Sequence, residues 1–328
     1  MLTPADQLSV LSDLATGNGV GPSTDPALLD PRNFTPGEIR LAVGLAKRGV
    51  PFRDAILPDL SAELARAITK DDPDNGPCLP TITADELLAT TFPEPVWAVP
   101  GILPCGLAIL GGRSKVGKSW LSLQIACAIG TGGRVFGDVV ERGRVLFIAL
   151  EDNGESLQER MVKQGWPAGA LVDFLHSENA GALGDLRADG GERMAQHIRA
   201  VGYRLVVIDT LSRALRGDQN DADAMTQALA PLQQIALSRN CAILILDHHH
   251  KMSGGLDCVS DILGSTAKGA VADTLWGLYR ERGKTGAKLG VTGRRVREQE
   301  LDLTWDMTTW AWQYRGEAGK APINETRA

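Results

Sequence analysis

The sequence has 328 residues, of which 43% are hydrophobic and 23% are charged, and it contains 37 glycines. This composition is typical of a globular protein with a sizeable core and excludes a mainly disordered chain. The formal net charge of −6 excludes a generally basic nucleic-acid coat protein, so any contact with nucleic acid must be local. Because the length exceeds that of one average domain, we expect two unequal domains.

The sequence has none of the features that direct a chain to a membrane. Its start lacks a basic stretch followed by an apolar one, and no apolar run approaches the roughly 20 residues that span a bilayer. Its five cysteines are scattered and form no CxxC pair. We therefore expect a cytoplasmic protein with reduced thiols and no membrane partner.

The first 75 residues carry helix signals but no cluster of chemically active residues. In Thr35-Pro36-Gly37-Glu38, the spacing of Thr35 and Glu38 is that of a capping box, and Pro36 suits a first helical position. The turn-rich stretch at residues 71–77 marks a boundary. We predict a helical module over residues 1–75, a main domain over residues 76–317 and a frayed tail over residues 318–328.

The main domain alternates apolar strands with helices after a short helix capped by Thr83 and Glu86. Strands that read as buried on both faces are expected at residues 107–110, 145–150, 205–208 and 242–246. Two alternating segments at residues 301–305 and 309–313 indicate an antiparallel meander that closes the edge of the sheet. The pattern predicts an α/β fold with a mostly parallel central sheet and a carboxy-terminal antiparallel extension.

A phosphate-binding motif, Gly112-x-x-x-x-Gly117-Lys118-Ser119, follows the first of these strands and opens a helix. Glycines let successive backbone N–H groups approach phosphate oxygens, and the helix N-terminus adds partial positive charge. Lys118 is expected to reach the β- and γ-phosphates and Ser119 to ligate Mg²⁺. The nucleotide-contacting residues are expected to be Gly112, Arg113, Ser114, Lys115, Val116, Gly117, Lys118, Ser119 and Trp120. The motif therefore predicts ATP and Mg²⁺ as cofactors.

Two later strands end in carboxylates that such a site requires. Asp209 follows an apolar strand and is the expected Mg²⁺ residue. Glu151 is expected at the tip of a strand beside the P-loop strand, where it can activate the attacking water as a general base. The alternative is that Glu151 and Asp152 cap the next helix, a role that suits Asp152 better.

The fourth strand ends in Asp247-His248-His249-His250-Lys251. Neighbouring histidines in an extended strand cannot all face one ion, so a metal site is not expected. We expect His248, or one of the two histidines after it, to sense the γ-phosphate.

The region from residue 251 to residue 297 is locally basic, with nine basic and four acidic residues. Such a segment is either a solvated face or a contact for nucleic acid.

These stretches together resemble RecA-like ATPases, most closely the RepA-type replicative helicases of phages, plasmids and other mobile elements. The resemblance covers residues 83–314 and includes a second lysine in the P-loop, Lys115. It implies a ring, usually a hexamer, with ATP between protomers and single-stranded DNA in the central channel. It also implies that Arg294, or Arg295 or Arg297 nearby, reaches the neighbouring protomer's nucleotide as an arginine finger.

Three functions remain open at this point. The first is a DNA helicase or translocase, in which residues 1–75 could contact a primase or another replication-initiation partner. The second is an ATP-dependent recombination mediator or clamp similar to RadA or KaiC, which unwinds nothing. The third is a regulatory ATPase switch that does not act on DNA.

Overall fold

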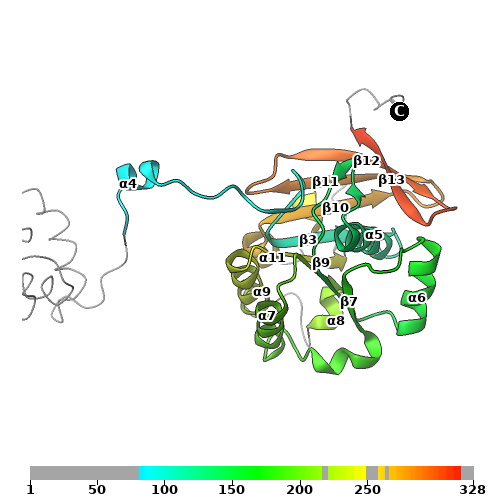
Figure 1. Cartoon of the computed structure of the whole chain (residues 1–328), viewed down its shortest axis with the longest axis horizontal. Helices are drawn as coiled ribbons and strands as arrows, with labels where there is room; N and C mark the ends of the chain where they lie inside the picture. Colours follow the sequence, from blue (N-terminus) through cyan, green and yellow to red (C-terminus); the bar gives the residue numbers. More distant parts are fainter. Residues whose placement is uncertain (1–80, 216–220, 249–257, 263–265, 319–328) are drawn as a thin grey trace, which may run out of the picture. The chain divides into compact units, whose positions relative to one another are not determined.

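The computed structural model describes residues 81–215, 221–248, 258–262 and 266–318 (Figure 1). The chain divides into two compact units, Met1–Phe92 and Pro93–Ala328, and each is described by itself. The helical module predicted over residues 1–75 lies outside the described residues. In the first unit, helix α4 (Ala84–Ala89) begins at the expected capping box, in which Thr83 and Glu86 bond each other's backbone N–H groups.

The second unit is built on a nine-stranded mixed sheet (Figure 1). Its strands are, in spatial order, β13 (Ala311–Glu317), β12 (Gln299–Asp306), β11 (Gly286–Gly293), β10 (Thr274–Arg280), β3 (Gly106–Gly112), β9 (Ala242–His248), β8 (Leu205–Asp209), β6 (Val145–Ala149) and β7 (Val172–His176). The strands from β10 to β7 run parallel, whereas β11, β12 and β13 pair antiparallel. This confirms the predicted fold class, an α/β core with a mostly parallel central sheet and a carboxy-terminal antiparallel extension.

Helices cover both faces of this sheet. Helix α5 (Lys118–Thr131) packs on one face, and α7 (Gly190–Val201), α9 (Ala222–Ser238) and α11 (Thr266–Val271) lie on the other (Figure 1). Because successive strand residues point to opposite faces, Leu110 belongs to the core under α5 while Ile109 belongs to the core under α9. This double covering explains why the central strands are apolar at every position.

Shorter elements complete the described part of the unit. They are the pair β1 (Trp97–Val99) and β2 (Leu103–Pro104), the pair β4 (Arg134–Val135) and β5 (Asp138–Val139), the 3-10 helix η3 (Ser177–Ala182), and the helices α6 (Gly154–Lys163), α8 (Leu211–Ala214) and α10 (Cys258–Ile262). The carboxyl ends of the parallel strands share one edge of the sheet. Side chains that follow these strands in the sequence therefore meet at that edge.

Candidate active site

The loop between β3 and α5 has the backbone shape of a phosphate cradle. Gly117 precedes the helix with a φ of 108°, and Lys115 also has a positive φ of 63°. A side chain at Gly117 would place its Cβ 2.8 Å from the Trp312 ring, and one at Gly112 would lie 3.0 Å from the Leu278 carbonyl oxygen. Both motif glycines are thus required by their surroundings.

The other loop residues differ in exposure. Arg113, Ser114 and Lys115 are exposed, whereas Val116 is buried. Trp120 is half-buried, and its ring packs on that of Trp310 with 5.2 Å between the centroids. The side chain of Trp120 therefore joins the loop helix to the carboxy-terminal strands.

Lys118 lies inside the loop with 6% of its surface exposed. Its Nζ donates to the carbonyl oxygens of Gly112 at 2.8 Å and Arg113 at 3.1 Å. Burial lowers the pKa of Lys118, and the carboxylates of Asp209, Asp247 and Glu151 oppose that shift. Three acidic side chains from three strand ends thus act on this one ammonium group.

Asp209 ends β8 and is 3% exposed. Burial raises its pKa to about 6; a hydrogen bond with the Ser119 side chain and the charge of Lys118 lower it, whereas Asp152 and Glu151 raise it further. A buried carboxylate bonded to the P-loop serine is the donor pair that a hard oxygen-seeking cation such as Mg²⁺ uses beside phosphates. Among the described residues, no group of three or more His, Cys, Asp or Glu side chains could hold a metal ion by itself.

Glu151 follows β6 and is exposed at the same edge of the sheet. Its Oε1 accepts a hydrogen bond of 3.1 Å from the Thr210 hydroxyl, so the residue after Asp209 orients it. The expectation that Glu151 follows a strand beside the P-loop strand is wrong, because β9 and β8 separate β6 from β3.

The capping alternative for the two acidic residues is also wrong. Asn153 is the N-cap of α6, and its side chain accepts from the Ser156 N–H at 2.8 Å. Asp152 instead forms an ion pair of 2.8 Å with Arg160. Glu151 is therefore not needed as a cap.

The tip of β9 lies directly beside the P-loop strand. His248 is the register partner of Gly112 and is exposed. Asp247, in contrast, is buried and pairs with Lys268 of α11 at 2.6 Å, where both side chains are at most 5% exposed. His249 and His250 lie outside the described residues.

Arg294 lies where the parallel strands begin, whereas the P-loop lies where they end. It follows Gly293, whose partner Thr274 begins β10 beside the start of β3. Its guanidinium donates to the Ala270 carbonyl at 2.7 Å and contacts Asp273 at 3.4 Å, and 61% of its side chain is exposed. Arg294 therefore does not belong to the site formed by its own P-loop.

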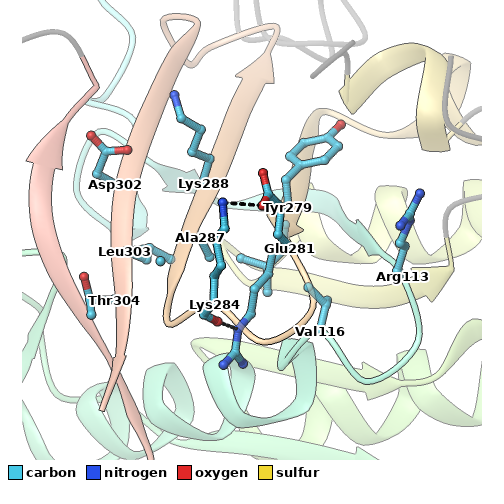
Figure 2. A pocket seen from close by; sticks show the side chains of 13 residues that line it. Arg113, Val116, Tyr279, Glu281, Lys284, Ala287, Lys288, Asp302, Leu303 and Thr304 are labelled. Atoms are coloured by element: carbon cyan, nitrogen blue, oxygen red, sulfur yellow. Dashed lines mark hydrogen bonds and ion pairs between the residues drawn. The ribbon is translucent and has the colours of Figure 1, made fainter. Parts of the chain in front are cut away.

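A cavity of about 610 Å³ adjoins the P-loop between Arg113 and the hairpin of β10 and β11 (Figure 2). Val116 and Leu303 contribute apolar surface, and Asp302 and Thr304 contribute oxygen atoms. At the rim, Lys284 pairs with Glu281 at 2.6 Å (Figure 2). The cavity has room and mixed polarity for a heterocyclic base.

Most of the described basic residues between 251 and 297 already have partners within the chain. Lys268, Lys284, Lys288 and Arg294 each pair with a carboxylate. The guanidinium of Arg280 lies over the rings of Trp305 and Trp312. The positive charge that this segment can offer to a nucleic acid is therefore smaller than its number of basic residues indicates.

Sequence reasoning missed two contributors to this site. Neither Lys268, which neutralises Asp247, nor Trp312, which contacts Gly117, belongs to the motifs. Their partners lie 21 and 195 residues away in the sequence, so no local pattern could indicate them.

Comparisons with known proteins show what this chain is similar to. A solved structure described as the RadB recombinase matches with a TM-score of 0.46 and 17% identity, over 69% of this chain and 94% of that one. None of the helices in the described part of the chain has the length and apolar character needed to cross a membrane. A family model described as an AAA domain matches residues 73–254, which is more than half of the sequence. The chain therefore belongs to this AAA domain family.

Proposed function

We propose that this protein is a Mg²⁺-dependent ATPase that assembles into a ring, usually hexameric, and acts on single-stranded DNA as a replicative-type helicase or translocase. The observation that carries the ATPase part is the convergence of Lys118, Ser119, Asp209 and Glu151 at one edge of the sheet. The DNA-directed part rests on the resemblance to RepA-type helicases.

Each residue has a separate task in the proposed reaction. Lys118 and the loop N–H groups bind the phosphates, and Ser119 with Asp209 would hold Mg²⁺, which supplies charge neutralisation between the β- and γ-phosphates. Glu151, oriented by Thr210, accepts the proton of the attacking water. His248, beside Gly112, is placed to respond to the γ-phosphate.

The cavity beside Arg113 is the proposed place of the nucleoside. It begins at the P-loop, so a nucleotide whose phosphates lie in the loop can extend its base into the space between Val116 and Leu303. Stacking against apolar surface and hydrogen bonds to Asp302 or Thr304 would then hold the base.

Arg294 supports a site completed between protomers. It is exposed and lies away from its own P-loop, which suits a finger that neutralises transition-state charge in the neighbouring subunit. Reaching a neighbour requires Arg294 to leave Asp273 and the Ala270 carbonyl. Arg295 and Arg297 are adjacent candidates for the same role.

The ATPase part is tested with two variants and a matched control. Lys118→Ala should lose ATP binding, whereas Glu151→Gln should bind ATP but lower kcat by about 100-fold or more, as expected for loss of a general base. Glu155→Gln removes an exposed carboxylate of the same type from the first turn of α6 and should leave turnover unchanged. Normal turnover by Glu151→Gln would assign the base to another residue.

The DNA-directed part is tested with the full-length protein. Single-stranded DNA should stimulate ATP hydrolysis, and the protein should separate a forked duplex when ATP and Mg²⁺ are present. Stimulation without strand separation would favour the recombination mediator or clamp. An absence of both effects would favour a regulatory switch.

One observation favours an ATPase that does not pull DNA. Lys268, Lys284, Lys288 and Arg294 are neutralised within the chain, so fewer free cations remain to track a DNA backbone. The slope of DNA affinity against salt concentration measures how many phosphates are contacted. A slope near zero would support the switch.

A further inference from the structure

The carboxy-terminal strand β13 (Ala311–Glu317) contacts the P-loop through the side chain of Trp312. The indole Nε1–H of Trp312 donates to the carbonyl oxygen of Gly117 at 3.1 Å, and the ring is 3% exposed. The same ring lies close enough to Gly117 to exclude any Cβ at that position. Trp312 thus contacts the residue that begins the phosphate-binding turn of the helix.

The orientation of this carbonyl has a direct consequence for phosphate binding. In a planar trans peptide, the C=O of one residue and the N–H of the next point in opposite directions. A donor that fixes the Gly117 carbonyl therefore also fixes the direction of the Lys118 N–H. That N–H belongs to the first turn of α5, and backbone donors in the first turn of a helix can face an anion.

The Gly117 carbonyl is held from two sides. The Leu121 N–H donates to it at 3.1 Å as the first helical hydrogen bond, and the Trp312 indole supplies the second donor. Gly117 has a positive φ and no side chain, so by itself this residue restricts its peptide plane less than any other. The indole hydrogen bond compensates for that freedom.

Trp312 is itself fixed to the same helix. The Gln124 side chain of α5 accepts from the Trp312 backbone N–H at 2.8 Å and donates to the Trp312 carbonyl at 2.9 Å. The guanidinium of Arg280, in the strand that lines the cavity, lies 5.4 Å from the Trp312 ring centroid. The indole therefore has little freedom to move away from Gly117.

From these contacts we infer that Trp312 is a positioning residue for nucleotide binding, which acts by fixing the Gly117–Lys118 peptide plane. This inference rests on the proposed ATP-binding function of the loop. Trp312 does not touch the reacting atoms, so its loss should weaken binding of ATP far more than it slows the chemical step.

The test is Trp312→Phe, which keeps an aromatic ring and removes the N–H donor. Loss of one hydrogen bond of this kind should raise the Kd of the fluorescent analogue mant-ATP, measured with Mg²⁺, by about 3- to 10-fold. The KM for ATP should rise in proportion, and kcat should change less than about 2-fold.

The matched control is Trp305→Phe. Trp305 packs edge-on against Trp312 with 5.2 Å between the centroids and also lies under Arg280, but in the described part of the chain its indole has no hydrogen bond to the loop. It should lose as much thermal stability as Trp312→Phe and keep the wild-type Kd. Equal Kd values for the two variants would overturn the inference.

A second variant decides the question if Trp312→Phe does not fold. Gln124→Glu keeps the acceptor for the Trp312 N–H and loses the donor to its carbonyl, so the Kd should rise in the same direction by a smaller factor. An unchanged Kd would again overturn the inference. If the wild-type protein itself does not bind mant-ATP with Mg²⁺, the proposed function fails instead.

Discussion

Asp209 is a carboxylate whose surroundings disfavour its charge. Its pKa of about 6 lies above the ordinary value of 3.8, so between these values the metal-free folded protein binds more protons than the unfolded chain. Its contribution to stability is therefore fully present below pH 3.8, decreases as the pH rises towards 6, and is lost above that pH.

The direction of this pKa shift predicts how Asp209→Asn changes the stability of the protein. At pH 8 and with EDTA present, the variant should be more stable than the wild type by about 3 kcal/mol, because a buried charge has been removed. At pH 5 the difference should fall to about half, because Asp209 is then largely protonated in the folded protein but still ionised in the unfolded chain. Urea unfolding at both pH values measures this, and an equal gain at pH 5 and pH 8 would contradict it.

The buried pair of Asp247 and Lys268 gives a second prediction at the level of residues. Lys268→Met leaves Asp247 buried without its counter-charge and should lower the free energy of unfolding by about 3 to 5 kcal/mol. Lys284→Met breaks a pair whose side chains are 69% and 73% exposed, and because solvent screens such a pair it should leave the free energy of unfolding almost unchanged. Denaturant unfolding of the two variants provides the comparison.

The sequence predicts the chemical residues of the site better than the residues that support them. Lys118, Ser119 and Asp209 have types and spacing that phosphate and metal chemistry impose, and the structure places them together. The positions of Lys268 and Trp312 in the sequence depend on tertiary packing, because a suitable donor from any element that reaches Asp247 or Gly117 could make the same contact. A single sequence does not contain that information.

At the level of elements, α5 packs tightly against the start of β7 at Gly130. A Cβ there would lie 2.8 Å from Cγ2 of Val172 and 3.2 Å from the Leu171 backbone nitrogen. We expect Gly130→Ala to lower the free energy of unfolding by about 1 to 2 kcal/mol, since overpacking exceeds the gain in helix propensity.

The Val172→Ala background separates the contact with the Val172 side chain from the contact with the Leu171 backbone. It removes the nearer of the two contacts, so Gly130→Ala should cost less there than in the wild type. Equal costs in both backgrounds, measured by thermal unfolding, would show that Val172 is not the source of the strain.

The sequence predicts four apolar strands that are buried on both faces, and it predicts the partly buried β12 and β13 from their alternation. It does not predict β10, although β10 is also buried. The apolar runs that become β3, β6, β8 and β9 are found within two residues of their expected ends. Strand β7 was missed because it is a half-buried edge strand that contains Asp173 and His176. The spatial order was also missed, since an apolar run does not specify its neighbours.

At the level of the whole molecule, the proposed arginine finger predicts complementation between inactive variants. Arg294→Ala and Lys118→Ala should each lack DNA-stimulated turnover, and a mixture should regain part of it. In the proposed ring, a mixture would contain interfaces that pair an intact P-loop with an intact arginine. Steady-state ATPase assays across mixing ratios measure the effect.

The control is the same mixture made with Lys118→Ala and the double variant, which can form no intact interface and should stay inactive. Chromatographic sizing with ATP, Mg²⁺ and single-stranded DNA should show a larger assembly than the protein alone. Full activity of Arg294→Ala would assign the finger to Arg295 or Arg297, or remove the need for one.

The bond between Trp312 and Gly117 also bears on the order in which the chain is synthesised. Gly117 leaves the ribosome 195 residues before Trp312. The P-loop follows β3, and both neighbours of β3 in the sheet, β9 and β10, also come later in the chain than α5. The nucleotide loop therefore cannot reach its final form during translation until β13 has been made. We expect a nascent chain stalled before residue 311 to bind ATP more weakly than the chain that includes β13, although it carries every residue of the motif.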